Sequence, residues 1–319
     1  MMTDREIFDN TVRPDTGLFY RKGDPEDPRM GEFVQREPQR FDRARMVILG
    51  SPQDIGVLRN GGRPGASRGP EFIRKMLYRL PVPEAIRPDR IFDLGDIRVS
   101  GTLESIHLVQ RKVVSSLLGR GKKCIVLGGG NDISFPDGAV FCRKTRKPVI
   151  INIDSHYDVR GDDIRNSGTP YRQILEGGYL PPERFYEMAV KPLMNAPRHE
   201  RFVRERGVGI NTLNSLREKG IRKTFNSILR ENSEADALFW GFDMDSVRAT
   251  DAPGVSAPYP SGLNAEEVLE IADIAGRDSR SNLLEISEVN PRLDIDNRTS
   301  LLAAMMIQRY LSSPRQWVQ

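Results

Sequence analysis

Short apolar runs alternate with longer amphipathic stretches along this chain. Residues 123–127 and 148–154 begin as runs rich in β-branched side chains, which are typical of strands buried in a sheet. Residues 103–118 instead place leucine, isoleucine and valine at near-helical spacing, which predicts a helix with one face on the core. This alternation recurs along the sequence and predicts an α/β fold. We expect a three-layer α/β/α sandwich around a mostly parallel sheet of about eight strands.

The pattern favours one main body preceded by an arm. Residues 1–42 are polar and rich in proline, aspartate and arginine, and we expect them to pack on the surface of the body. Residues 43–319 contain no repeat, low-complexity segment or linker that would indicate a further boundary. We therefore predict a single α/β domain over 43–319.

The strand at 148–154 runs into a group of polar side chains. Asp154, His156 and Asp158 follow one another at every second position. Side chains alternate along an extended backbone, so these three are predicted to leave one face. Carboxylates and an imidazole that converge at the end of a buried strand are costly without a cation between them. A divalent metal is the simplest candidate, and an exposed loop is the alternative.

Two further strand ends carry chemistry of the same kind. Asn131 and Asp132 follow the strand at 123–127, and Asp243 and Asp245 end a strand predicted over 237–245. The carboxyl ends of parallel strands form the ligand-binding edge of such a sheet. Gathered there, the carboxylates would repel one another unless cations separate them. Oxygen-rich ligation with one imidazole favours a pair of Mn²⁺ ions ahead of Zn²⁺. Asp243 and Asp245 could alternatively be capping or turn residues.

Composition excludes several classes of function. The net charge of +4, with acids and bases interspersed, provides no basic arm or stripe for nucleic acid. No run approaches the ~20 apolar residues of a membrane span, and the charged N-terminus lacks a signal-peptide core. Cys124 and Cys142 lie in or near apparent core segments, which favours a reducing cytoplasm. We interpret His107, in a predicted helix, and His199, in a charged loop, as bystanders.

Longer motifs surround these positions. Residues 154–158 read Asp-Ser-His-Tyr-Asp, and residues 242–247 read Phe-Asp-Met-Asp-Ser-Val. Residues 285–291 read Glu-Ile-Ser-Glu-Val-Asn-Pro. Together they resemble the arginase/agmatinase (ureohydrolase) superfamily, from about Gly17 to Tyr310. Gln53 with the segment that follows it, and Arg160 with 167–174, favour the formimidoylglutamase branch.

The resemblance implies a metal centre with one departure from the family pattern. Asn131 stands where the family carries its first metal-binding histidine, and an amide oxygen is a weaker donor than imidazole. We therefore expect two Mn²⁺ per chain, one of them bound weakly. The implied metal ligands are Asn131, Asp154, His156, Asp158, Asp243 and Asp245.

The implied reaction is hydrolysis of a C–N bond in a linear amidine. The best candidate substrate is N-formimidoyl-L-glutamate, which would give L-glutamate and formamide in histidine degradation. Asp158 is expected to move a proton to the leaving nitrogen, and Glu288 to face the cationic amidinium. Since this substrate has two carboxylates, the substrate-binding candidates, besides Glu288, are Arg160, Asn166, Ser167, Gly168 and Arg172. Arg165 is a further candidate, and Arg59 and Arg63 are weaker ones.

Other functions stay open at this point. The chain could act on a guanidino compound (agmatine, guanidinobutyrate, arginine or guanidine), or it could be a metal-depleted, non-catalytic homologue. A nucleotide site at 128–130 is disfavoured because no phosphate-binding lysine follows the glycines. The resemblance also implies a homo-oligomer, either a trimer or a hexamer.

Overall fold

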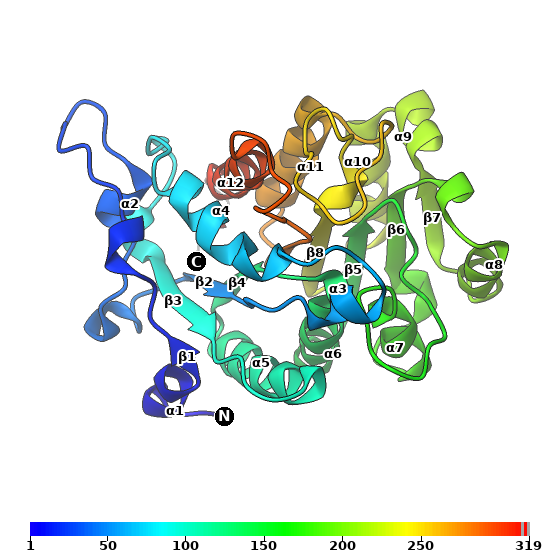
Figure 1. The fold of residues 1–319 in the computed structure, drawn as a ribbon, viewed down its shortest axis with the longest axis horizontal. Helices are drawn as coiled ribbons and strands as arrows, with labels where there is room; N and C mark the ends of the chain where they lie inside the picture. Colours follow the sequence, from blue (N-terminus) through cyan, green and yellow to red (C-terminus); the bar gives the residue numbers. More distant parts are fainter. Residues whose placement is uncertain (314–315, 318–319) are drawn as a thin grey trace.

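A nine-stranded sheet forms the centre of the molecule in a computed structural model that describes residues 1–313 and 316–317 (Figure 1). Every neighbouring pair of strands is parallel except the edge pair β1–β3. The prediction of a mostly parallel sheet of about eight strands is therefore confirmed. In spatial order the strands are β1 (Thr11–Val12), β3 (Ile91–Ile97), β2 (Met46–Gly50), β4 (Lys123–Leu127), β9 (Ser281–Ser287), β8 (Ala237–Asp243), β5 (Pro148–Ile153), β6 (Phe185–Val190) and β7 (Gly209–Thr212).

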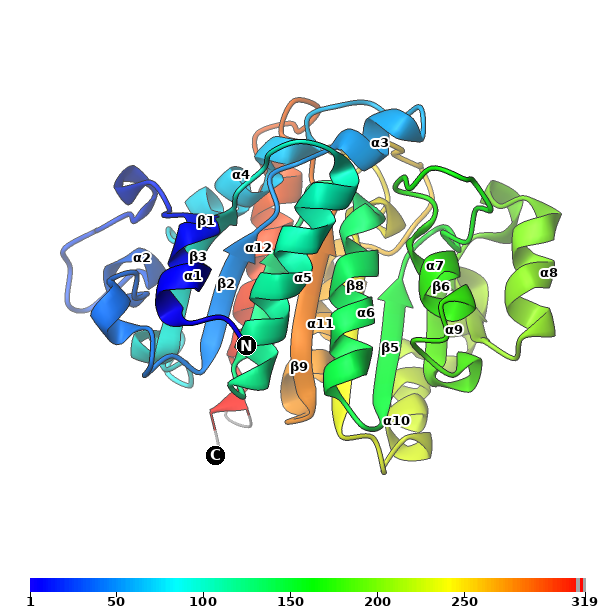
Figure 2. The ribbon, with the colours of Figure 1, turned by 90° about the horizontal axis from the view of Figure 1, so that it is seen from below.

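Helices cover both faces of this sheet (Figure 2). The core is accordingly split in two, and successive residues of one strand belong to opposite halves: Ile151 packs with one cluster and Ile150 with the other. One face is covered by α4 (Gly69–Leu77), α9 (Leu213–Lys219), α10 (Ile221–Glu231), α11 (Ala265–Arg277) and α12 (Arg298–Leu311). The other is covered by α5 (Leu103–Gly119), α6 (Ser134–Lys144), α7 (Pro170–Glu176) and α8 (Pro197–Glu205).

The N-terminal segment completes one edge of the sheet. It contains α1 (Asp4–Asp9), β1 and α2 (Met30–Phe33), and β1 pairs antiparallel with β3. Ile7 and Phe41 are buried in the core below this edge. The segment thus contributes apolar side chains to the body as well as a strand. Over the described residues, no helix combines the length and apolarity needed to cross a membrane.

Two strands end earlier than their sequence pattern predicts. β5 stops at Ile153 and β8 at Asp243, so Asp154 and Asp245 lie beyond the extended backbone. The cause is local, because the Asp154 carboxylate accepts the backbone N–H of His156 at 2.7 Å. The Asp243 carboxylate likewise accepts the N–H of Asp245 at 2.8 Å. Such aspartate turns compete with strand backbone and bend the chain.

Candidate metal centre and substrate pocket

Four neighbouring strands supply the candidate site from their carboxyl ends. In the order β4-β9-β8-β5, β4 leads to Asn131, β9 leads to Glu288, β8 ends in Asp243, and β5 leads into the segment 154–158. Residues that are far apart in the sequence therefore converge because the sheet places their strands side by side. This edge is where ligands bind in open α/β sheets.

Four aspartates and one histidine at this edge of the sheet form a tight cluster. His156 Nδ1 lies 3.3 Å from Asp154 Oδ1 and 3.2 Å from Asp245 Oδ2. Ligand atoms of Asp154, His156 and Asp158 lie within 4.8 Å of one another, as do those of Asp154, Asp243 and Asp245. The sequence prediction that these residues converge is met, but through turns after the strands and not along an extended backbone.

Backbone geometry at this edge is unusual. Asp158 has φ of 46° and Glu288 has φ of 63°, both in the left-handed region that non-glycine residues seldom adopt. Such conformations cost on the order of 1–3 kcal/mol and persist where the surroundings impose them, commonly at functional sites. Here they aim both carboxylates into the same cavity.

The electrostatics of the cluster fit a divalent cation. Burial raises the pKa of Asp158 and of Asp243, and neighbouring carboxylates raise both further. Burial alone would lower the pKa of His156, but the charges of Asp245 and Asp154 outweigh it and raise that pKa. Among the described residues, the buried atoms Asp154 Oδ2 and Asp245 Oδ1 have no hydrogen-bond partner. Oxygen donors left unpaired around one imidazole are a suitable ligand set for Mn²⁺.

His156 is oriented for such a role. Its Nε2 lies 3.2 Å from the Tyr259 hydroxyl, while Nδ1 faces the carboxylates. Metal-binding histidines ordinarily use the second ring nitrogen to hold a hydrogen-bond partner that fixes the ring. Tyr259 is a partner that the sequence analysis did not identify.

Asn131 lies beside the cluster, and hydrogen bonds fix the orientation of its side-chain amide. Its Nδ2 donates to Asp158 Oδ2 at 2.6 Å, and its backbone N–H donates to Glu288 Oε1 at 2.9 Å. Its Oδ1 accepts from the hydroxyls of Ser134 at 3.0 Å and Ser287 at 2.9 Å. The amide oxygen therefore faces two serines in this arrangement, and the amide nitrogen faces the predicted proton carrier.

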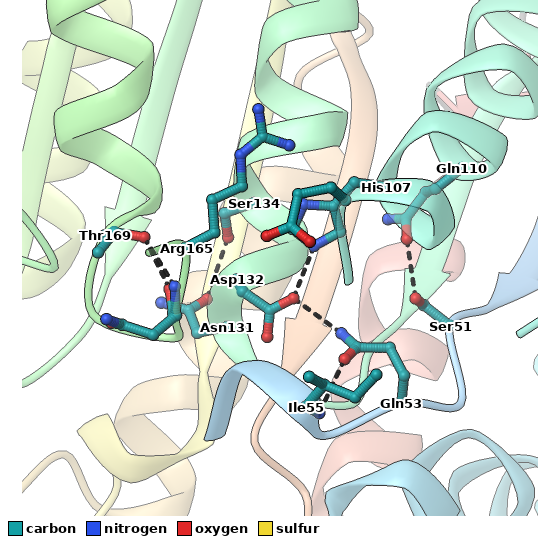
Figure 3. A network of polar contacts seen from close by, with 12 residues as sticks. Ser51, Gln53, Ile55, His107, Gln110, Asn131, Asp132, Ser134, Arg165 and Thr169 are labelled. Carbon is teal, nitrogen blue, oxygen red and sulfur yellow. Dashed lines mark hydrogen bonds and ion pairs between the residues drawn. The ribbon is translucent and has the colours of Figure 1, made fainter. Parts of the chain in front are cut away.

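Asp132 belongs to a different network, shown in Figure 3. Its Oδ2 lies 2.7 Å from His107 Nε2 and accepts from Gln53 Nε2 at 2.8 Å. His107, in α5, is therefore the buried partner of the Asp132 carboxylate, although His107 does not line the pocket. The expectation that Asp132 joins the metal-facing group is wrong, because its side chain is held by α5 and Gln53.

This network supports one wall of the pocket, α3 (Ile55–Arg59). A Cβ atom at Gly56 would lie 2.0 Å from Asp132 Oδ1, so only glycine lets the helix approach so closely. The Gly56 carbonyl in turn accepts the Ser167 N–H at 3.1 Å, and Asn60 Nδ2 donates to the Ser167 hydroxyl at 3.0 Å. The wall and the loop around Ser167 are thus locked together.

A cavity of about 570 Å³ opens above the cluster. Asp154 is fully buried beneath it, and the other predicted residues divide between its lining and its supports. Asn166 holds the loop by donating to Asp162 Oδ2 at 2.8 Å, and Arg172 pairs with Glu176 at 2.9 Å. The predicted residues that line the cavity are Asn131, His156, Asp158, Arg160, Ser167, Gly168, Asp243, Asp245 and Glu288, together with the weaker candidate Arg63.

The start of α8 forms a part of the lining that the sequence analysis missed. Asn195, Arg198 and His199 all face the cavity. The prediction that His199 lies in a loop is wrong, since it belongs to the first turn of α8, and its description as a bystander does not fit its position. No apolar or motif pattern marks this segment, although Pro197 ahead of a charged amphipathic stretch is a helix-start signal.

The fold and this centre define a class of protein: the chain belongs to the arginase family, whose sequence model matches residues 44–312. The formimidoylglutamase of Rhodococcus jostii (strain RHA1) is 32% identical over 277 residues, which cover 83% of this chain and 85% of that protein. The formiminoglutamase of Trypanosoma cruzi, solved with Mn²⁺, is 34% identical, has a TM-score of 0.82, and is matched over 89% of this chain and 97% of that one. The formimidoylglutamase of Bacillus subtilis is 25% identical with a TM-score of 0.85, over 93% and 97% of the two chains.

Proposed function

We propose that this chain is a manganese-dependent hydrolase that converts N-formimidoyl-L-glutamate to L-glutamate and formamide. The observation that carries the proposal is the cluster of Asp154, His156, Asp158, Asp243 and Asp245 at the floor of a cavity. The names of the relatives support the substrate, since curated formimidoylglutamases are about 32% identical over most of the chain.

The five clustered side chains would hold two Mn²⁺ ions, with Asn131 as a sixth, weaker donor. When bound, such a pair lowers the pKa of a water molecule and draws charge from the reacting carbon. For Asn131 to offer its oxygen, the amide must turn about its last side-chain bond. Ser134 and Ser287 permit this, because a hydroxyl accepts from an amide N–H as readily as it donates to a carbonyl.

The chain's own residues position the substrate and move its protons. Glu288 is the anion that pairs with the cationic amidinium and fixes the plane of the group. Asp158 is the proton carrier, since its carboxylate borders the cavity beside the other clustered side chains. It takes a proton from the attacking water and gives it to the leaving nitrogen, which departs as the amine of glutamate.

Assembly and location complete the proposal. We propose a homo-oligomer, a trimer or hexamer, as the family resemblance implies, and sedimentation is the direct test. Cys124 and Cys142 are both buried and unbridged, which supports residence in a reducing compartment such as the cytoplasm.

The test is a substrate panel with matched variants. The protein is reconstituted with Mn²⁺ and assayed with formimidoylglutamate, arginine, agmatine, guanidinobutyrate and guanidine. We expect turnover of formimidoylglutamate by the wild type, loss of turnover in Asp243→Asn, and full activity in Asp236→Asn, an exposed residue preceding β8 at its opposite end. No turnover of any of the five compounds would refute a hydrolase, and turnover of a guanidino compound alone would reassign the substrate.

A further inference from the structure

The cavity is polarised from floor to mouth. Its floor is built from carboxylates, whereas Arg160, Arg198 and His199 lie together on the lining contributed by α8 and the 160–168 loop. These groups lie close enough to interact: burial lowers the pKa of His199, and the charges of Arg198 and Arg160 lower it further. With the aspartates occupied by metal, a ligand that spans this cavity would place its cationic end against Glu288 and an anionic end at the mouth.

Most of the arginines around the cavity are already engaged. Arg160 donates from Nε to Asp162 Oδ2 at 2.7 Å, and its stem packs on Gly168. Arg63 donates to the carbonyl of Ser256 at 2.8 Å. These contacts fix the loops, pair the charge of Arg160 with Asp162, and occupy two nitrogens of Arg63.

Arg198 differs from Arg160, whose charge is paired with Asp162, and from Arg63, whose Nε and Nη2 are held by backbone carbonyls. Its Nε lies 3.3 Å from His199 Nε2, and within the described part of the chain no carboxylate lies at ion-pair distance from its guanidinium. A neutral imidazole can accept this hydrogen bond and orient the guanidinium without neutralising it. The α8 helix begins here at Pro197, after the N-cap residue Ala196, and no side chain caps its first N–H groups. The helix dipole therefore adds positive potential.

We infer that Arg198, oriented by His199, binds a carboxylate of the substrate and makes this pocket select an amidine that carries carboxylates. This inference rests on the proposed function and goes beyond it by naming the specificity residue. Arginine suits the task because its planar fork pairs two N–H groups with two carboxylate oxygens. Arg172, a candidate from sequence alone, is paired instead with Glu176 outside the cavity lining.

Two substrates that share the amidine group, only one of which carries carboxylates, test the inference. Arg198→Gln is compared with the wild type on N-formimidoyl-L-glutamate and on N-formimidoyl-butylamine, which keeps the amidine but has no carboxylate. We expect KM for formimidoylglutamate to rise by about 10- to 100-fold, the size of a lost charged hydrogen bond, with kcat nearly unchanged. Activity toward the butylamine derivative should be unchanged, and Arg198→Lys should recover part of the loss.

Controls keep the outcome separate from the proposed function. Arg204→Gln removes an exposed arginine of the same helix that pairs with Glu200, and it should behave as wild type. Equal loss of both substrates in Arg198→Gln, or no loss of either, would overturn the inference. If the wild type hydrolyses neither compound, the proposed function fails, and calorimetric binding of N-formyl-L-glutamate decides the inference. Binding by the wild type that Arg198→Gln abolishes would support it; binding by both proteins or by neither would overturn it.

Discussion

Two buried acidic clusters in this chain solve the same electrostatic problem in different ways. In one, Arg74 is almost fully buried and pairs with Asp93 at 2.9 Å and with Asp96 at 2.6 Å. In the other, at the floor of the cavity, Asp154 and Asp245 each retain a buried oxygen without a partner among the described residues. Burying a carboxylate is costly unless a cation or donor compensates it. The first cluster carries its cation in the chain, and the second is built to take one from solution.

The largest expected effect concerns the floor cluster. Asp158→Asn keeps the shape of the side chain but removes the group that carries the proton. We expect kcat to fall by about 10²- to 10⁴-fold, the usual range for a general acid–base residue. Steady-state assays with Mn²⁺ measure this, and circular dichroism checks the fold. A kcat within threefold of wild type would remove Asp158 from the mechanism.

Substitutions in the Arg74 cluster should change the stability of the protein and not its catalytic activity. Arg74→Met leaves Asp93 buried without its cation, and we expect a loss of about 3–5 kcal/mol in the free energy of unfolding. Arg68→Met, which breaks an exposed pair with Glu71, is the control and should cost less than about 1 kcal/mol. Urea denaturation compares the two variants, and equal small losses would show that the buried pair contributes little.

A buried acid outside both clusters, Asp137, has no arginine as an ion-pair partner among the described residues and does not line the cavity. Burial raises the pKa of Asp137 to about 6, and Gln110 donates to it at 2.9 Å. The folded state therefore keeps a proton that the unfolded chain releases, so stability falls as pH rises from about 4 through about 6. Asp137→Asn removes one carboxyl of the buried pair that Asp137 forms with Glu285, and it should flatten this decline. Unfolding at several pH values in saturating Mn²⁺ measures it, and an unaltered slope would contradict this interpretation.

The smallest expected effect lies at Asn131. Asn131→His supplies an imidazole where an amide stands, so Mn²⁺ should bind about tenfold more tightly, or about 1.4 kcal/mol. Titration followed by calorimetry measures the affinity, with Asn131→Ala as the variant that has no donor. Unchanged affinity and stoichiometry in the histidine variant would show that Asn131 does not limit the site.

The sequence was most informative where strand ends carry charged motifs. The β/α alternation predicts the sheet, and Asp154, His156, Asp158, Asp243 and Asp245 could be grouped because parallel strands end at one edge. It could not show that the aspartates bend the backbone out of its strands, since that depends on hydrogen bonds within each turn.

Residues whose positions depend on tertiary packing could not be predicted from the sequence. Asp132 is next to Asn131 in the sequence, yet its partner is His107, which lies in a different helix. Only the folded structure brings that helix next to Asp132. Arg198 and His199 lie in a charged segment without a motif, and they reach the cavity because α8 begins beside it.

The central claim is that the floor cluster depends on metal ions, and the manganese content of the purified protein tests it most directly. The protein is loaded with Mn²⁺, freed of excess metal by gel filtration, and analysed by elemental mass spectrometry together with Asp243→Ala. We predict close to two Mn²⁺ per wild-type chain, one held less tightly, and at most one in the variant. A wild-type protein that retains no Mn²⁺, or a variant that retains as much as wild type, would contradict the account.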